Sequence, residues 1–448
     1  MKRMKEKIRV LLSTEGTYPF HQGGVSTWCD ILVNQMPGCE FSLFSIIMNP
    51  YVTQKFSLPP GTELIKVPLW GTEEPSEHLA IPFSQVYLAK KRTTDEIVKE
   101  RFLPLFTQLV QEFLSKRKDP GKLGSILMQL HDYFEEYEYK ASFKSKIVWE
   151  SFKEQIIGIC RDKSNGISEP SIFAMSQSLG WIYRFFNILN TPIPRVDVTH
   201  SAAAAFCGVP CVLAKLKYGT PFVLTEHGVY LREQYFSLSQ RGYVGYMNTF
   251  LIRMILSVTG LNYFYADMVS PVCGYNTRWE TEFGVPQKNI RVIYNGVDKN
   301  VFSPGLEERR DSVPTIVTVA RIDPLKDIKT LLRAAAIVKS AVPEVRFKVF
   351  GSVSVEAYYK ECLDLRQELG LVDNFFFEGH VVDVTKAYRQ GDIVALSSIS
   401  EAFPYSVVEA MLVGKAVIAT DVGGIREALG ESGILVDPRN PLALADGM

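Results

Sequence analysis

Two glutamates near the end of this 448-residue chain are spaced to hold a ligand between them. Glu401 and Glu409 lie eight positions apart in the segment SISEAFPYSVVEAM, residues 398–411. Pro404 fits the first turn of a helix, and Gly414 fits the position just after its end. We therefore expect Glu401 on a loop and Glu409 one or two turns into the helix.

The start of that helix is suited to phosphate. The backbone N–H groups of Tyr405 and Ser406 would lie at a helix N-terminus, which carries unused donors and a partial positive charge. With a carboxylate on each side to accept from hydroxyls, the block suits a diphosphate with a sugar at each end, which is a nucleotide-sugar. The alternative is two solvated glutamates on a surface helix.

A second block, TVARIDPLKD over residues 318–327, places an arginine and a lysine between a predicted strand and a predicted helix. Arg321 offers a planar fork of donors and Lys326 a mobile point charge, so both can reach one diphosphate. The alternative is a pair of ordinary surface cations. Gly351, in the strand-end turn FGS, is a further position where backbone can approach a phosphate closely.

These blocks resemble the retaining glycosyltransferases of family 4, which have the GT-B fold. The glutamate pair matches that family's E-x7-E signature, and the block with Arg321 and Lys326 matches its donor-phosphate motif. A third segment, IYNGVD over residues 293–298, is similar to the family's interdomain segment, although Tyr294 departs from the usual proline.

The resemblance implies a role for each of these residues. Arg321, Lys326 and the helix start would stabilise the charge that develops on the leaving diphosphate. Glu409 would hold the ribose hydroxyls, and Glu401 would hold the donor sugar and orient its anomeric carbon. The reaction would retain the anomeric configuration without a protein nucleophile. Since these cations serve the phosphates, no metal and no cofactor are expected.

The N-terminal region narrows the resemblance. A predicted strand at 8–12 runs into STEGTYPFHQGGVSTW, residues 13–28, where Gly23 and Gly24 open a predicted helix. A Gly-Gly turn lets backbone approach a phosphate or sugar, although an ordinary strand-to-helix turn explains it equally well. The dinucleotide fingerprint G-x-G-x-x-G is absent here. This string resembles the cytoplasmic glycosyltransferases of bacterial Pel exopolysaccharide assembly.

A second stretch, LTEHGVYLRE over residues 224–233, agrees with the Pel-type resemblance. By that resemblance His227 sits near the reacting sugar, whereas the alternative is a structural histidine at a strand end. The implied enzyme is cytoplasmic and peripheral at the inner membrane. It moves a sugar from a UDP-sugar, UDP-glucose being the expected donor, to a growing polysaccharide, in contact with membrane-associated assembly proteins.

Two other functions stay open. A GT-B epimerase would release free sugar without an acceptor, and a phosphorylase would carry a lysine-bound pyridoxal phosphate. A non-catalytic scaffold of an export complex would bind nucleotide-sugars without turnover. The intact set of donor residues argues against the scaffold.

Composition excludes some classes of function. Lys+Arg and Asp+Glu both number 49, so no basic excess points to nucleic acid. No apolar signal segment follows the basic start of the chain. The longest apolar run, Thr249–Phe264, contains Arg253 and Asn262, which favours a buried helix over a membrane span. The six histidines and seven cysteines show no metal-ligand spacing.

Strands and helices alternate in two series, which predicts an α/β protein with parallel, doubly wound sheets. We assign residues 1–300 to an N-terminal acceptor-side domain and 301–448 to a nucleotide-sugar-binding domain. A helical insertion of about residues 75–190 interrupts the first. Its aromatic residues are expected in the core, the alternative being a docking surface for a partner. Every motif follows a predicted strand, so we expect them to line one cleft between the domains.

Several element boundaries are also expectations. The pattern predicts helices over 201–217 and 261–283, and strands over 290–293 and 434–437. Asn440 should cap a last helix that has Pro441 at its first position. Members of the resembled family continue with a helix that packs back on the first domain. Without it we expect near-normal UDP binding, weaker transfer and exposed apolar surface on both domains.

Overall fold

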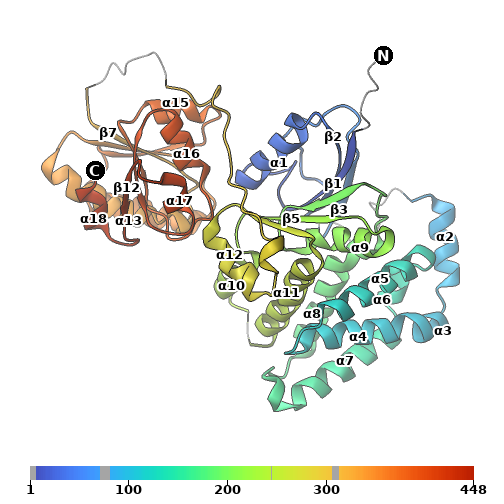
Figure 1. Ribbon diagram of the computed structural model, residues 1–448. Coiled ribbons are helices and arrows are strands. Elements are labelled where there is room, and N and C mark those ends of the chain that lie inside the picture. The colour runs from blue at the N-terminus through green and yellow to red at the C-terminus, as the bar shows by residue number, and fades with distance from the viewer. Residues whose placement is uncertain (1–6, 71–80, 244, 305–311) are drawn as a thin grey trace, which may run out of the picture. The chain divides into compact units, whose positions relative to one another are not determined.

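The computed structural model describes residues 7–70, 81–243, 245–304 and 312–448, which form two compact units (Figure 1). The first unit runs to Pro271 and includes Arg278–Arg291, while Val272–Thr277 and the chain from Val292 onward form the second. The start of the expected insertion, residues 75–80, lies outside the described residues.

This division differs from a single boundary at residue 300 because a short early segment joins the second unit. The carboxylate of Glu427 accepts hydrogen bonds from the N–H groups of Gly274 at 2.6 Å and Tyr275 at 2.7 Å. Those two bonds attach residues 272–277 to the second unit.

A six-stranded parallel sheet forms the centre of the first unit, in the order β3-β2-β1-β4-β5-β6. This is the 3-2-1-4-5-6 order of doubly wound sheets, which reverses between the first and fourth strands. Its strands are short and rich in buried apolar residues, as expected for a sheet covered on both faces. They are β1 Ile8–Glu15, β2 Cys39–Ile47, β3 Leu64–Pro68, β4 Val198–Ser201, β5 Phe222–Glu226 and β6 Met268–Pro271.

Helices outside the insertion cover this sheet, and three predicted boundaries there are wrong. The helix expected over 201–217 begins only at Val209, because carboxylates hold the N–H groups of Ala204 and Cys207 in the preceding turn. The helix expected over 261–283 is interrupted by β6, and the strand expected over 290–293 is a single bridge at Ile290. The helices are α1 Gly24–Gln35, α9 Val209–Tyr218, α10 Tyr230–Gln240, α11 Gly245–Tyr265 and α12 Thr277–Glu282.

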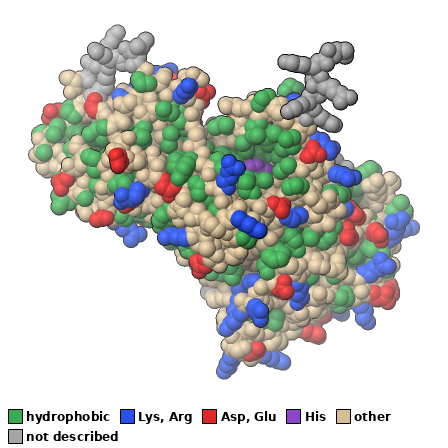
Figure 2. All heavy atoms as spheres, viewed as in Figure 1, with side chains coloured by type: hydrophobic (Ala, Val, Ile, Leu, Met, Phe, Trp, Pro, Cys, Tyr) green, Lys and Arg blue, Asp and Glu red, His purple; other side chains and the backbone are tan. Residues whose placement is uncertain are grey.

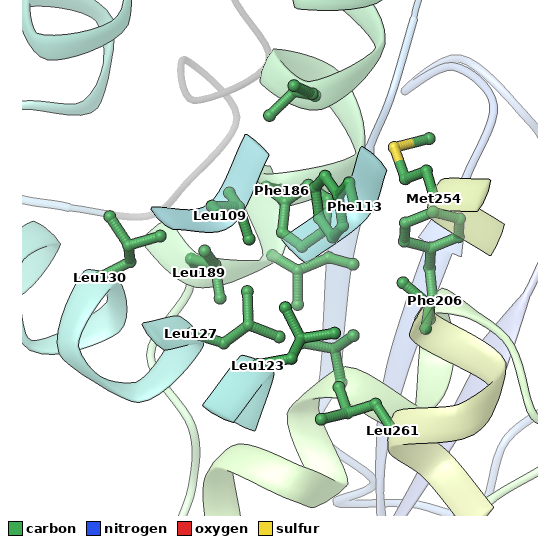
Figure 3. Close-up of a cluster of buried hydrophobic side chains, with 14 of the residues drawn as sticks. Leu109, Phe113, Leu123, Leu127, Leu130, Phe186, Leu189, Phe206, Met254 and Leu261 are labelled. Atoms are coloured by element: carbon green, nitrogen blue, oxygen red, sulfur yellow. The ribbon is translucent and has the colours of Figure 1, made fainter. Parts of the chain in front are cut away.

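Residues 83–185, between β3 and β4, are largely helical, and several of these helices lie against α9 and α11 (Figure 1). Their buried apolar side chains belong to one core with those of α9 and α11. Figure 3 shows Leu109 and Phe113 of α4 facing Leu123 and Leu127 of α5 in the shared core. The interpretation of the aromatic residues as core is confirmed for most of them. The helices are α2 Phe83–Arg92, α3 Asp95–Ile97, α4 Leu103–Leu114, α5 Pro120–Glu136, α6 Tyr139–Phe143, α7 Lys146–Arg161 and α8 Ile172–Phe185.

Helix α2 departs from this pattern, because none of its residues is buried, as is also true of the three-residue helix α3. Phe83 is 82% exposed and stacks on Tyr87. On the face of the molecule seen in Figure 2, acidic and basic side chains are interspersed. Throughout the described residues, no helix combines the length and the apolar character needed to cross a membrane.

The second unit repeats the same topology, with a six-stranded sheet in the order β12-β11-β10-β7-β8-β9. Counted from β7 it is again 3-2-1-4-5-6, reversing between β7 and β10. The α/β, doubly wound prediction is therefore confirmed for both units. The strands are β7 Thr315–Val319, β8 Arg346–Phe350, β9 Phe375–Gly379, β10 Ile393–Leu396, β11 Ala416–Thr420 and β12 Ile434–Val436.

The helices of the second unit bury their apolar faces on this sheet. The predicted cap of the last helix is confirmed, since Asn440 accepts a hydrogen bond from the N–H of Ala443 at 3.0 Å. Leu444 in that helix is fully buried. The helices are α13 Ile328–Ala341, α14 Glu356–Glu368, α15 Val384–Arg389, α16 Tyr405–Leu412, α17 Ile425–Leu429 and α18 Pro441–Asp446.

Candidate functional site

The reversal of strand order marks one special position in each sheet. Loops leave the two central strands in opposite directions there, which opens a crevice at the carboxyl ends of the strands. In the second unit, Arg321 and Lys326 follow β7 and Glu401 follows β10, so they flank this position. Seven of the ten predicted site residues belong to the second unit, and His227, Gly23 and Gly24 belong to the first.

Lys326 and Glu401 form an ion pair across the reversal point, with Nζ 2.5 Å from Oε1. The hydroxyl of Ser398 donates to the same carboxylate oxygen at 2.6 Å. Oε2 of Glu401 makes no hydrogen bond or ion pair with another of the described residues. The carboxylate is thus fixed by one oxygen and keeps the other for a ligand.

Hydrogen bonds between the two loops bring this pair together. The N–H of Ile399 donates to the carbonyl of Leu325 at 2.9 Å, and the hydroxyl of Ser397 donates to the carbonyl of Lys326 at 2.8 Å. These bonds join segments that leave different strands, and the sequence gives no direct sign of them.

Arg321 lies exposed on the loop after β7, and its guanidinium pairs with no acid among residues that the structure describes. The same loop touches the backbone at Gly351, where an added Cβ would lie 1.9 Å from the carbonyl oxygen of Ala320. Gly351 is therefore required for the contact between the two loops, while a direct phosphate contact by its backbone stays a prediction.

Helix α16 begins at Tyr405, so Pro404 is its cap and not a residue of its first turn. The proline supplies no side-chain cap for the first N–H groups of the helix, including that of Ser406. Gly414 follows the helix with φ +79°, as its predicted role as a helix stop requires. This end therefore presents the partial positive charge expected for an anion site.

Glu409 lies one turn into α16 and is mostly buried. Its Oε2 accepts a hydrogen bond from the hydroxyl of Tyr388 at 2.6 Å, and its Oε1 has no such partner in the described part of the chain. Burial raises the pKa of the Glu409 carboxyl, and the Tyr388 hydrogen bond opposes that rise. Sequence reasoning missed Tyr388, because an aromatic residue on a short helix shows nothing of its partner.

A glycine turn after β11 packs against the backbone of the Glu401 loop. Sequence reasoning did not identify this turn. Gly423 has φ +60°, and a Cβ there would lie 1.7 Å from the carbonyl oxygen of Glu401. The N–H of Gly424 donates to the carbonyl of Ala402 at 2.7 Å. Two consecutive glycines that begin three positions after the end of β11 were the available signal.

The first unit has a cavity of about 330 Å³ at its own reversal point. The loops after β1, β4 and β5 contribute to its lining, as does the end of α8. The polar and acidic lining residues are Glu15, Thr17, Cys207, His227, Tyr230, Glu233 and Gln234. No lysine or arginine is among the described residues that line it.

His227 lines this cavity, as the loop after β5 would suggest. Its ring packs edge-on against Trp28 at 4.6 Å, and burial lowers its pKa to about 3. Nε2 is buried and has no hydrogen-bond partner among the described residues. A neutral imidazole with an unused nitrogen in a cavity wall can serve a ligand hydroxyl.

Gly23 and Gly24 do not line the cavity. They lie exposed at the start of α1, where the carbonyl of Gly23 accepts a hydrogen bond from the N–H of Thr27 at 2.9 Å. The predicted Gly-Gly helix start is confirmed, and its predicted contact with a donor stays a prediction.

The chain belongs to the protein family described as Domain of unknown function (DUF3492), whose model matches residues 8–288. Residues 313–448 match the family model described as Glycosyl transferases group 1. The second unit, which holds the Lys326–Glu401 pair, is therefore a group 1 glycosyltransferase domain.

Curated relatives match over part of the chain. The D-inositol 3-phosphate glycosyltransferase of Thermobispora bispora is 33% identical over 176 residues, covering 36% of this chain and 41% of the relative. That of Mycolicibacterium smegmatis is 37% identical over 164 residues, covering 34% of this chain and 37% of the relative. The chain thus spans only about two fifths of the length of these relatives.

Solved structures match over nearly the whole chain. Sucrose-phosphate synthase from Thermosynechococcus elongatus has a TM-score of 0.59 at 18% identity, covering 98% of this chain and 88% of that one. Anabaena HepE, solved with UDP and glucose, has a TM-score of 0.56 at 17% identity with the same coverage. These identities establish the fold alone. The predicted GT-B class, two Rossmann-like units, is confirmed.

Proposed function

We propose that this member of the DUF3492 family is an enzyme that transfers a hexose from a UDP-sugar to a polysaccharide acceptor. The expected donor is UDP-glucose. The observation that carries this proposal is the Lys326–Glu401 pair, which spans the reversal point of the sheet one loop away from the start of α16. It combines a cation for phosphate with a carboxylate for sugar in a group 1 glycosyltransferase domain.

The diphosphate would lie between the loop after β7 and the N-terminus of α16. Departure of the nucleotide places negative charge on its phosphate oxygens, and fixed positive groups stabilise that charge. Lys326 and Arg321, whose guanidinium pairs with no acid in the described part of the chain, supply this positive charge together with the helix end. These groups provide the charge that a metal ion supplies in other transferases.

The carboxylates of Glu401 and Glu409 each bind a different sugar of the donor. Glu401 keeps Oε2 for hydroxyls of the donor sugar, and Glu409 keeps Oε1 for the ribose. Because Glu401 is already fixed by Lys326 and Ser398, it can orient the anomeric carbon with little loss of side-chain freedom.

The proposed transfer retains the anomeric configuration. The acceptor hydroxyl attacks the anomeric carbon on the face that the diphosphate leaves. The bond from that carbon to the phosphate oxygen breaks as the new glycosidic bond forms. The proton of the acceptor hydroxyl passes to the departing phosphate, so no protein nucleophile takes part.

The proposed acceptor site and the proposed contact with partner proteins both lie in the first unit. Its cavity, with His227 in the wall, is the proposed seat of the acceptor. The N-terminal string favours a growing exopolysaccharide of the Pel type. The exposed apolar and basic face of α2 is the proposed contact with an acidic, membrane-associated assembly protein.

A panel of nucleotide-sugars, assayed for nucleotide release with and without oligosaccharide acceptors, tests this function. We expect UDP-glucose to be consumed and the product to keep the donor's anomeric configuration, measured by NMR. Release of free sugar without an acceptor would favour an epimerase instead. UDP binding without any turnover would favour a scaffold, and no UDP binding would overturn the proposal.

A further inference from the structure

One carboxyl group in the first unit is not used by the proposed transfer chemistry. Glu15 ends β1 and lines the cavity at the reversal point. Its Oε1 accepts a hydrogen bond from the hydroxyl of Tyr230 at 3.1 Å, and its Oε2 accepts one from the N–H of Cys207 at 3.3 Å. A backbone hydrogen bond at Phe206 is a third contact of this carboxyl. A carboxylate has about four lone-pair positions, so the group can accept once more.

The surroundings of Glu15 leave its charge uncompensated. Burial raises its pKa to about 7, and the hydrogen bonds from Tyr230 and from the backbone at Cys207 and Phe206 only partly oppose this. The cavity also holds the carboxylate of Glu233, which lies 2.1 Å from the position that a Cβ at Gly228 would take. The described lining offers no basic side chain to bind a second anion.

The remaining walls are apolar. They include Val25, Ile47 and Leu69, with the ring of Phe185 packed 4.1 Å from that of Phe206. Apolar walls with a few fixed polar groups are typical of sites for small organic ligands. A sugar without negative charge fits both the apolar and the acidic parts of the lining. Its C–H faces can cover the apolar side chains, and its hydroxyl or amino groups can donate hydrogen bonds to Glu15 and Glu233.

We propose that Glu15 determines acceptor specificity by accepting a hydrogen bond from a hydroxyl or amino group of the acceptor sugar and by rejecting acidic sugars. This inference rests on the proposed function. The acceptor end is then a neutral or amino sugar, and uronic acids and sugar phosphates are excluded by the acidic, lysine-free lining.

The competing explanation is that Glu15 has a purely structural role. Glu226 is an example of a carboxyl group with such a role in the same unit. It ends β5, is fully buried and is not among the residues that line the cavity. Its oxygens accept from the N–H of Ala204 at 2.7 Å and from the hydroxyl of Tyr263 at 3.0 Å. Glu226→Gln is therefore the matched control for Glu15→Gln.

The test compares wild type, Glu15→Gln and Glu226→Gln with three oligosaccharide acceptors: neutral, amino-substituted and uronic acid-containing. For Glu15→Gln we expect KM for the first two to rise roughly ten- to a hundredfold, the range for losing a hydrogen bond to a charged group. Discrimination against the uronic acid should fall. UDP affinity, measured by calorimetry, should not change. Glu226→Gln should alter thermal stability but not the order of preference.

Two results would overturn the inference. One is a wild-type preference for the acidic acceptor. The other is a Glu15→Gln variant that loses rate with every acceptor alike. If wild type binds no UDP and turns over no donor, the proposed function fails separately. Calorimetry of the three oligosaccharides with wild type and Glu15→Gln then still decides whether Glu15 selects among them.

Discussion

Nζ of Lys326 lies 2.5 Å from Oε1 of Glu401, and the two residues leave different strands on either side of the reversal point of the second sheet. The cation and the carboxylate therefore act as one unit. Removing either leaves the other partly buried without its partner, which costs more than the loss of a single contact. The Glu401 side chain is only 10% exposed, so this effect should be large for the lysine variant.

Removal of the phosphate-binding cations should lower turnover. Arg321→Ala and Lys326→Ala should each reduce kcat by about a hundredfold or more, the scale for one donor that stabilises a developing charge. Lys326→Ala should also weaken UDP binding more than Arg321→Ala, because it leaves Glu401 unpaired near the diphosphate. Lys329→Ala is the control, since Lys329 pairs with the exposed Glu361. Near-normal transfer in both test variants would contradict the assignment.

The two glutamates should differ in their kinetic effects. Glu409→Ala should raise the apparent KM for the donor about tenfold or more, because it removes a ribose contact present in ground and transition states alike. Glu401→Ala should mainly lower kcat, because it orients the reacting sugar. Tyr388→Phe, which frees Oε2 of Glu409, should show a weaker form of the first effect. Calorimetry that found UDP binding unchanged in Glu409→Ala would exclude the ribose role.

Both the general fold, which is confirmed, and the donor-binding roles, which stay predictions, were inferred from local patterns in the sequence. Strand and helix alternation is visible in runs such as Thr315–Val319, and the E-x7-E spacing places its own helix. The element boundaries that were predicted wrongly depend on contacts between segments that are distant in the sequence. β6 is only four residues long, and the alanine run after β4 is held open by Glu226, so neither shows a regular period.

The same limit applies to the candidate site. Lys326 and Glu401 could be assigned separately, but their pairing depends on loop-to-loop hydrogen bonds at Ile399 and Ser397. Glu15 belongs to the N-terminal string, yet its place in the cavity lining appears only when β1 and β4 lie side by side. Charged residues that end otherwise apolar strands are the signal to examine first.

The contribution of Glu226 to stability should fall as pH rises through the neutral range. Burial raises the pKa of Glu226 to about 8, against an ordinary value of 4.5. Between these values the unfolded chain releases the proton and the folded chain keeps it. The contribution is therefore intact below pH 4.5 and is lost as pH rises towards 8, by at most about 1.4 kcal/mol per pH unit.

Urea unfolding at several pH values between 5 and 8 measures this dependence. Glu15 and Glu280, each with a pKa raised to about 7 by burial, should add to it in the same direction. Glu226→Gln removes one titrating group. The decline of the unfolding free energy with pH should therefore become shallower by the slope that corresponds to about one proton. An unchanged slope in that variant would show that Glu226 does not titrate differently in the folded state.

The exposed face of α2 should carry the association with assembly partners. None of its residues is buried, Phe83 and Tyr87 stack 6.2 Å apart, and Lys90, Lys91 and Arg92 form its last turn. Exposed aromatic residues beside basic ones suit an acidic partner surface, since burial of the rings and charge attraction then act together. Phe83→Asp should therefore reduce copurification with the membrane fraction of cells that make the polysaccharide.

The same variant should keep its transfer activity with soluble acceptors, because α2 contributes nothing to the described lining of the cavity. The matched control is Val382→Asp, which introduces the same charge at a position that is 94% exposed in the second unit. It should copurify with membranes as wild type does. Equal loss in both variants would mean that added negative charge alone prevents association. If purified wild type binds vesicles of anionic lipid as strongly as it binds membranes, the contact is with lipid and the protein partner is excluded.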